Sequence, residues 1–324
     1  MDSVQHRFVA LSQSLQERII GQPRLVERLL IALLADGHLL VEGAPGLAKT
    51  RAIRLLGAAV QGRFHRIQFT PDLLPADLTG SDVFRPQDGS FVFQPGPLFN
   101  NLILADEINR APAKVQAALL EAMAERQISV GQTSYRLADP FLVMATQNPI
   151  EQEGTYPLPE AQLDRFLLHV VIDYPDAAAE RRILQLARQE AASDTALPAG
   201  KVLAPLQAEE LRQARRQVLQ VHLAEALEEY LVQLVLATRD PAPWGEDLAS
   251  AIDYGASPRA TIALDRCSRA RAWLAGRDFV TPDDIQSLAP DVLRHRILLR
   301  YEAEARGLRP DALIARLLER LPVP

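Results

Sequence analysis

The chain has 324 residues, of which 48% are hydrophobic and 23% charged, a composition that excludes an intrinsically disordered protein. At ~100–200 residues per domain, the length predicts about two domains. The formal net charge of −6 argues against a general nucleic-acid-binding protein, which usually presents a basic face. No apolar run approaches the ~20 residues that a membrane helix needs, and residues 1–17 lack the apolar core of a secretory signal, so we expect a cytoplasmic protein.

Two amphipathic helices open the chain. Apolar residues recur at helical spacing over residues 4–20, and Gly21 is suited to end this helix in a left-handed conformation. Pro23 then opens the second helix. A short strand at 38–41 follows, leads into a glycine-rich turn, and is succeeded by a helix over about 49–59.

The next part of the chain alternates strands with helices and hairpins. Four more strands are expected, at His65–Phe69, Leu102–Ala105, Phe141–Ala145 and Leu167–Ile172. Between them lie a helix at Ala113–Ala124 and two β-hairpins at Asp82–Phe93 and Ile128–Leu137. This alternation predicts an α/β domain with a five-stranded parallel sheet and helices on its faces.

Strand signals largely stop near Pro175, where we place the boundary between a first domain, 1–175, and a second, 176–324. Helical periodicity predicts an all-α second domain with segments at Ala179–Ala192, Ala208–Ala237, Pro258–Ala275 and Thr281–Val292. Ser193–Pro205 is expected to be a surface loop. The single cysteine, Cys267, excludes an internal disulfide and a cysteine-rich metal site, and we expect it to be buried on a helix.

A candidate phosphate-binding loop joins the first strand to its helix. It consists of Gly43, Ala44, Pro45, Gly46, Leu47, Ala48, Lys49 and Thr50. A phosphate needs inward-pointing backbone N–H groups, a helix N-terminus and a lysine that reaches its outer oxygens, and Thr50 offers a hydroxyl for Mg²⁺. The general pattern has glycine before the lysine; Ala48 is a mild departure, which we expect to keep a helical conformation. The alternative is an ordinary strand–turn–helix.

Two acidic residues end the strand that begins at Leu102. Asp106 and Glu107 would reach the carboxyl edge of a parallel sheet, where ligands bind. Asp106 can orient Mg²⁺ through its water shell, and Glu107 can act as the base that polarises an attacking water. The alternative is a solvated acidic strand end.

Three further residues are candidates for the same chemistry. Asn148 ends the strand segment Phe141–Asn148 and would place an amide beside the γ-phosphate; otherwise it is a turn asparagine before proline. Arg165 offers a rigid fork for the charge that develops in phosphoryl transfer, or else a salt bridge. Arg259, at a helix start in the second domain, is either solvated or touches nucleotide across the domain cleft.

The order of these pieces resembles the AAA+ ATPases, and their exact strings resemble the MoxR family over about residues 15–310. Ala48 before the lysine agrees with the MoxR variant of the loop. The matching segments are Ile20–Gln22, Gly43–Thr50, Arg66–Gly80, Asp106–Pro112, Gln116–Met123, Ala145–Pro149, Leu158–Phe166 and Gly255–Ala260.

The resemblance implies a role for each candidate. Gly43–Thr50 and Leu102–Glu107 resemble the Walker A and Walker B motifs. Asn148 resembles sensor 1, Arg165 the arginine finger and Arg259 sensor 2. The first hairpin resembles the helix-2 insert and the second the presensor-1 hairpin. The segment formed by Ile20, Gly21 and Gln22 resembles the one that lies against adenine.

The resemblance also implies a function. Family members are chaperone-like ATPases that use ATP and Mg²⁺. They form rings, usually hexamers, with nucleotide between subunits. They act with von Willebrand factor A domain partners in maturing protein complexes, including metal-centre insertion. The client protein is not indicated. Three alternatives stay open: a DNA-associated motor, against which the acidic charge argues; a magnesium-chelatase-like metal-insertion subunit; and a non-hydrolysing scaffold, against which Glu107, Asn148 and Arg165 together argue.

Overall fold

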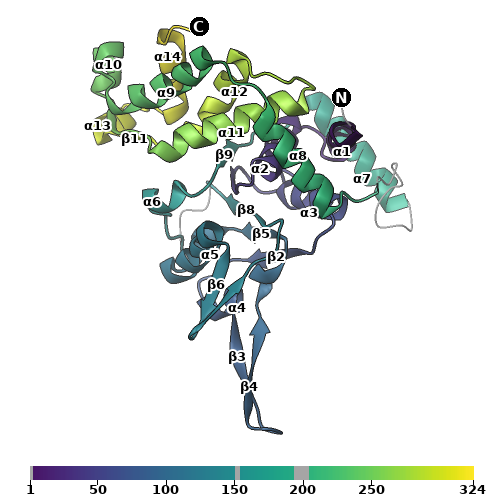
Figure 1. Cartoon of the computed structure of the whole chain (residues 1–324). Helices are drawn as coiled ribbons and strands as arrows, with labels where there is room; N and C mark the ends of the chain where they lie inside the picture. Colours follow the sequence, from purple (N-terminus) through teal and green to yellow (C-terminus); the bar gives the residue numbers. More distant parts are fainter. Residues whose placement is uncertain (1–2, 150–153, 193–203) are drawn as a thin grey trace.

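The structure, a computed structural model, describes residues 3–149, 154–192 and 204–324. A parallel sheet lies at the centre, helices of the second half of the chain lie on one side of it, and a long hairpin extends to the other side (Figure 1). The expected loop Ser193–Pro205 falls almost wholly outside the described residues.

The central sheet confirms the predicted five parallel strands. They are β1 Leu39–Glu42, β2 Phe64–Gln68, β5 Leu102–Asp106, β8 Leu142–Gln147 and β9 Leu168–Val171. Their order is β2-β5-β8-β1-β9, and every neighbouring pair is parallel. All five strands therefore end at one edge of the sheet, where ligands of such sheets bind.

Helices cover both faces of the sheet. Successive apolar residues of a strand point to opposite faces, so both faces are apolar. Leu39 and Val41 point into the larger core, whereas Leu40 belongs to the smaller one. The larger core includes side chains of α1 Ser3–Arg18, α2 Pro23–Leu34 and α3 Lys49–Ala59, and the smaller includes those of α4 Pro75–Thr79 and α5 Ala113–Glu125. Short turns of 3₁₀ helix lie at Pro97–Phe99, Ile108–Arg110 and Ala242–Trp244.

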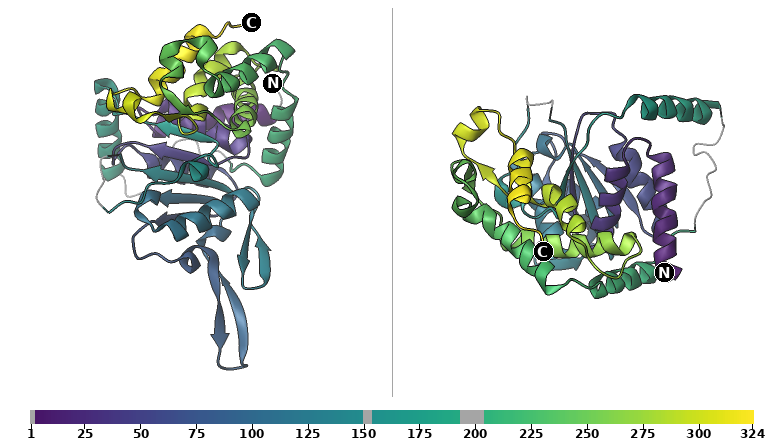
Figure 2. Two further views of the ribbon diagram at one scale, coloured as in Figure 1. Left: turned by 90° about the vertical axis from the view of Figure 1, so that its left-hand side faces the viewer. Right: turned by 90° about the horizontal axis from the view of Figure 1, so that it is seen from above.

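Both predicted hairpins are present as two-stranded antiparallel sheets. The first pairs β3 Gly80–Arg85 with β4 Ser90–Pro95, and the second pairs β6 Gln127–Val130 with β7 Thr133–Arg136. The first hairpin projects well beyond the body of the molecule (Figure 2). Gly89 and Gly131, in the two turns, have positive φ angles, which glycine adopts without a steric penalty.

The second half of the chain is helical, as predicted, with one small addition. Its helices are α7 Ala177–Ala192, α8 Ala208–Gln220, α9 Glu225–Arg239, α10 Glu246–Ala249, α11 Pro258–Leu274, α12 Pro282–Leu293, α13 Tyr301–Ala305 and α14 Pro310–Arg320. Two short strands, β10 Ile252–Tyr254 and β11 Leu298–Leu299, pair within it. Cys267 is buried on α11, as expected. In the part of the chain that the structure describes, no helix combines the length and apolarity needed to cross a membrane.

The prediction of one helix over Ala208–Ala237 was wrong, because two helices share this range with a break at residues 221–224. In the break, the His222 backbone N–H donates to the Asp278 carbonyl at 2.8 Å, and the Val280 N–H donates to the His222 carbonyl at 2.9 Å. Pairing with a distant segment thus replaces the helical hydrogen bonds that the local pattern favours.

A buried ion cluster joins the helical half of the chain to α2. The fully buried carboxylate of Asp291, on α12, accepts hydrogen bonds from Arg28 at 2.8 Å, Arg24 at 2.7 Å and Arg294 at 2.6 Å. Burial would raise the pKa of Asp291, but the surrounding arginines outweigh it and hold this pKa below its ordinary value. Removing one partner would leave buried charge unpaired, so the cluster fixes how the two halves meet.

Acid is expected to destabilise the fold through His38, which lies before β1. Its Nδ1 accepts from the Val143 N–H and its Nε2 donates to the Met123 carbonyl, so the buried ring is held neutral. Burial, helped by Arg126, lowers the pKa of His38 to about 3. The unfolded chain, with a His pKa near ~6.5, then binds the extra proton first, and the free energy of unfolding falls by up to about 1.4 kcal/mol per pH unit below ~6.5. Urea unfolding of the wild type and His38→Gln between about pH 7 and about pH 5 should show a shallower pH slope in the variant; equal slopes would contradict this assignment.

Candidate active site

The loop Gly43–Thr50 connects β1 to α3 at the carboxyl edge of the sheet. A Cβ on Gly43 would lie 2.5 Å from Ile172 Cγ1, so only glycine fits there. Gly46 has φ +85°, with open space where a side chain would be. Ala48, expected to be helical, instead has φ 59° and ψ 16°, in the left-handed region, as the residue that caps α3. A left-handed backbone conformation just before the right-handed helix costs about 1–2 kcal/mol for a residue with a Cβ.

Lys49 and Thr50 are the first two residues of α3, so they share the helix N-terminus with its unpaired N–H groups. The Lys49 ammonium donates to the Gly43 carbonyl at 2.7 Å, across the mouth of the loop. Burial lowers the pKa of Lys49, against the opposing charges of Asp106 and Glu107. A partly desolvated ammonium at a helix N-terminus favours an anionic ligand.

A cavity of about 250 Å³ extends from this loop. Its lining includes four residues of the loop, Pro45, Gly46, Leu47 and Ala48. Ile20 and Gln22 also line it, together with the apolar side chains Ile183, Leu186 and Ala187 of α7. The phosphate loop and the segment expected to contact adenine therefore border one space.

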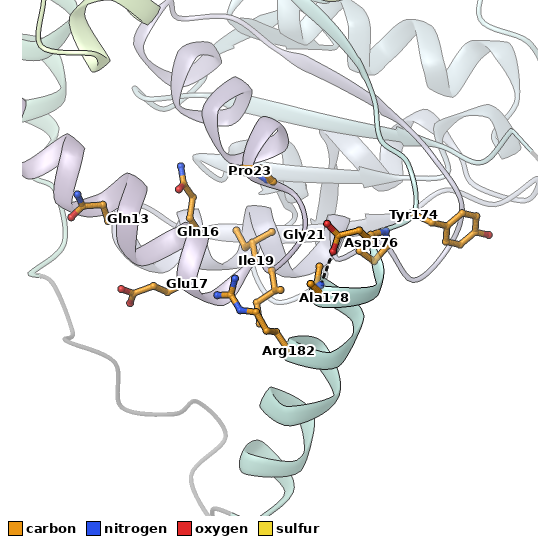
Figure 3. Close-up of a pocket in the computed structure, with 13 residues that line it drawn as sticks. Gln13, Gln16, Glu17, Ile19, Gly21, Pro23, Tyr174, Asp176, Ala178 and Arg182 are labelled. Atoms are coloured by element: carbon orange, nitrogen blue, oxygen red, sulfur yellow. Dashed lines mark hydrogen bonds between the residues drawn. The ribbon is translucent and has the colours of Figure 1, made fainter.

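A second cavity, of about 700 Å³, lies next to the first and shares Ile20, Tyr174 and Pro175 with it. Figure 3 shows it between the end of α1, the segment around Gly21 and the start of α7, with Arg182 reaching from α7 toward α1. Gly21 has φ +81°, as predicted, and the Gln22 side-chain amide donates to the Asp173 carbonyl at 2.9 Å. The Ile20–Gln22 segment is thus anchored to the chain that follows β9.

The two acidic residues lie at the end of β5, as predicted. The Asp106 carboxylate is buried and accepts from the Thr146 hydroxyl at 2.6 Å and from Arg66 Nη2 at 2.7 Å. Glu107 has φ 57°, and its backbone N–H donates to the same Thr146 hydroxyl at 2.9 Å. Its carboxylate accepts from Gln68 Nε2 at 2.7 Å and lies 3.3 Å from Arg110 Nε. Strand β2 therefore contacts both carboxylates, and β8 holds the Asp106 carboxylate and the Glu107 backbone.

Asn148 follows β8, which lies beside both β1 and β5. The register pairs Glu42, just before the loop, with Gln147, just before Asn148, and the Gly43 N–H donates to the Gln147 carbonyl at 3.4 Å. Asn148 is buried. The register thus brings it to the edge that carries the loop and Asp106.

Arg165 and Arg259 do not join this group. Both line a separate cavity of about 390 Å³, which also includes Gly37 and Leu167, the residues that lead into β1 and β9. This cavity therefore lies at the amino edge of the sheet, opposite the loop. Arg165 Nη1 donates to the Leu120 carbonyl at 3.1 Å. Arg259, expected either to be solvated or to touch nucleotide across the domain cleft, thus lies at the edge of the sheet opposite the phosphate loop of its own chain.

The cavity at the amino edge is rich in arginine. Arg259 Nη1 lies 3.5 Å from the Asp164 carboxylate, which also accepts from Arg296 at 2.8 Å. Its charged lining residues are Asp36, Arg126, Asp164, Arg165, Arg259, Arg266 and Arg296. Five arginines against two aspartates make a concave, positively charged surface on a chain with net charge −6. Such a surface suits a polyphosphate.

Sequence reasoning missed the residues that hold the site residues in place. Arg66 and Gln68 lie two residues apart on β2; Arg66 contacts Asp106, and Gln68 contacts Glu107. Thr146, on β8, contacts both acidic residues. Their only signal was a polar pattern at the ends of strands that flank an acidic strand end. Arg266 carried no signal beyond lying seven residues after Arg259 on one helix.

Comparisons with known proteins agree with this geometry. Residues 38–168 match the model of the "ATPase family associated with various cellular activities (AAA)", and residues 246–317 match that of the AAA lid domain. The chain is 45% identical to Chaperone MoxR1 of Mycobacterium tuberculosis, over 94% of this chain and 79% of the relative. It is 37% identical to Protein MoxR of Paracoccus denitrificans, over 98% and 96%. A crystal structure of a candidate ATPase from Cytophaga hutchinsonii is similar with a TM-score of 0.90 at 43% identity, over 99% of this chain and 96% of that one. The chain therefore belongs to the MoxR family of AAA+ ATPases.

Proposed function

We propose that this protein hydrolyses ATP with Mg²⁺ and uses the energy, as a homo-oligomeric ring, in the chaperone-like remodelling or maturation of protein complexes. The observation that carries the proposal is the meeting of Gly43–Thr50, Asp106, Glu107 and Asn148 at one sheet edge. We assign residues 1–175 to the nucleotide-binding domain and 176–324 to the helical lid. The strands of the central sheet all precede Pro175, which supports this division.

In this proposal ATP lies in the cavity beside the loop. The backbone of Gly43–Lys49 and the Lys49 ammonium hold the phosphates, and Ile20, Gly21 and Gln22 lie against adenine. The Thr50 hydroxyl and the Asp106 carboxylate are hard oxygen donors of the kind that Mg²⁺ prefers, so this donor set fits the ion. Bound Mg²⁺ would neutralise charge on the phosphate oxygens. Thr50 would contact the ion directly and Asp106 through water.

Glu107 is proposed as the base that takes the proton of the attacking water. Its carboxylate is only partly exposed, and its Oε2 atom is contacted by both Gln68 and Arg110. A positioned carboxylate that keeps free lone pairs can accept a proton while its hydrogen bonds fix its direction. Asn148 would hold the water and the γ-phosphate with its amide.

Arg165 and Arg259 are proposed to act on the nucleotide of a neighbouring subunit. They line the amino edge of the sheet, whereas the loop lies at the carboxyl edge, so a head-to-tail ring would bring one subunit's arginines to the next subunit's phosphates. We propose a hexamer, from the family resemblance alone.

The proposed partner is a von Willebrand factor A domain protein, and the proposed site of action is the cytoplasm. Both come from the family resemblance, and the name Chaperone MoxR1 of a relative supports the chaperone-like role. The acidic net charge supports a protein client over nucleic acid.

ATP binding is tested by the Lys49→Ala variant. With Mg²⁺ and ATP at ~100 times the dissociation constant, the folded state gains about 2.7 kcal/mol, and the wild-type melting temperature rises. Lys49→Ala should lose most of that rise, while its melting temperature without ATP stays near the wild-type value. Lys114, exposed at the start of α5, provides the matched control Lys114→Ala, which should keep the full rise. A full rise in Lys49→Ala would remove the phosphate-loop assignment.

A further inference from the structure

The projecting hairpin carries an exposed pair of aromatic side chains. The register of β3 and β4 places Phe84 opposite Phe91. Their ring centroids lie 5.3 Å apart, and the two residues are 51% and 68% exposed. The pair contributes nothing to either hydrophobic core. Adjacent rings that are exposed on a protruding element are available for contact with a partner.

This pair continues a row of rings that runs to the base of the hairpin. Residues two apart on a strand point to the same face, so Phe93 lies on the face of Phe84 and Phe91. Phe93 stacks on Tyr135 of the second hairpin with 4.1 Å between centroids, and Phe99 packs edge-on against Phe93 at 5.5 Å. We call these five residues the aromatic stripe. Its base is packed and its outer end is open.

The opposite face of the hairpin is different. Its one apolar pair, Val83 and Val92, is flanked on both sides by polar pairs, which are Ser81–Gln94 and Arg85–Ser90. One face of the hairpin thus carries the aromatic rings, whereas the other carries a single valine pair between polar pairs.

We propose that the aromatic stripe binds an extended segment of the client polypeptide that has apolar side chains and no net negative charge. This inference rests on the proposed function as a remodelling ATPase. A row of single rings along a two-stranded hairpin matches the width of one extended chain, whose alternate side chains can pack on successive rings.

Size argues against a second copy of this chain as the occupant. At about 200 Å² per ring, Phe84 and Phe91 expose roughly 250 Å² together. A stable interface buries about 800 Å² on each partner. The open part of the stripe is too small for a folded partner and is sufficient for a few side chains of an extended one.

Charge argues against single-stranded nucleic acid, which also stacks on aromatic rings but needs a basic groove for its phosphates. Between Gly80 and Pro95 the hairpin has one arginine and two aspartates. Arg85 lies on the valine face, whereas Asp82 lies opposite Phe93 on the aromatic face. A carboxylate beside the rings repels phosphates and favours segments that carry lysine or arginine among their apolar residues.

The test compares the two faces of the hairpin in the full chain. Fluorescence anisotropy measures binding of three labelled probes: a synthetic peptide of leucine, serine and lysine, the same peptide with glutamate for lysine, and an oligothymidylate. The wild type should prefer the lysine peptide. Phe84→Ser with Phe91→Ser should weaken that binding at least about tenfold, as losing central aromatic contacts does. Val83→Ser with Val92→Ser, the matched control, should bind like the wild type.

Three results would overturn the proposal. The wild type could fail to bind the lysine peptide, the two double variants could bind that peptide equally well, or the wild type could bind the oligothymidylate more tightly than the lysine peptide. A change of oligomeric state in the phenylalanine variant alone, measured by analytical ultracentrifugation, would assign the stripe to contacts between copies and would also overturn it. ATP hydrolysis is measured on the same samples and should be unchanged in both variants. Absence of hydrolysis in the wild type would instead refute the proposed function.

Discussion

Replacing Glu107 by glutamine is expected to lower ATP hydrolysis by ~10²–10⁴-fold, the usual effect of losing a positioned base, with ATP binding retained. Glutamine has nearly the same shape, and its carbonyl can still accept the hydrogen bond that Gln68 donates to Glu107 at 2.7 Å. It cannot take a proton from water. Phosphate release gives the rate, and the rise in melting temperature with ATP and Mg²⁺ gives the binding.

The matched control is Glu121→Gln, on the exposed side of α5 and outside the cavity. This variant removes one carboxylate from the same domain and should hydrolyse ATP at the wild-type rate. Wild-type turnover in Glu107→Gln would refute the assigned base. A fall in turnover accompanied by loss of the ATP-dependent rise in melting temperature would place Glu107 in binding instead.

Replacing Arg165 by alanine is expected to lower hydrolysis by ~10³–10⁵-fold, the contribution of an arginine finger, and to leave ATP binding intact. In the described part of the chain the Arg165 side chain donates one hydrogen bond, from Nη1 to the Leu120 carbonyl, so the fold should tolerate the change. At the amino edge of the sheet, Arg165 lines a cavity together with four other arginines. Phosphate release and thermal melts are the measurements.

Arg165→Lys separates charge from shape. Lysine keeps the positive charge but lacks the planar fork that grips phosphate oxygens, so only a small part of the activity should return. Full activity in Arg165→Lys would reduce the role to a diffuse electrostatic one. Wild-type activity in Arg165→Ala would remove the role altogether.

The sequence predicted the elements whose signals are local. Leu102–Ala105 is apolar without interruption because the strand is buried on both faces, and the neighbouring strand β8 has the same pattern. The loop Gly43–Thr50 is contiguous, so its strand–turn–helix context could be read directly from the chain. The hairpins were predictable because their turns contain Gly89 and Gly131.

What the sequence did not reveal depends on distant partners. The helix break at His222 is made by a segment more than fifty residues away. The left-handed Ala48 follows from how the loop enters α3, and alanine gives no sign of it. The position of Arg259 depends on the packing of α11 and α12 on α2 through buried contacts such as those of Asp291. The sequence of an arginine at a helix start does not indicate which edge of the sheet it will reach.

The account's central claim, that one subunit's arginine serves the neighbouring subunit's nucleotide, is tested most directly by mixing two inactive variants. Arg165→Ala and Glu107→Gln are combined in equal amounts, with subunit exchange verified by fluorescence transfer between labelled chains. If the arginine acts across the interface, roughly a quarter of the head-to-tail interfaces in a closed ring pair an intact Glu107 with an intact Arg165. ATP hydrolysis should then return to a fraction of the wild-type rate. If exchange is complete and hydrolysis stays absent, each site still lacks one group, and the proposed interfacial site is contradicted.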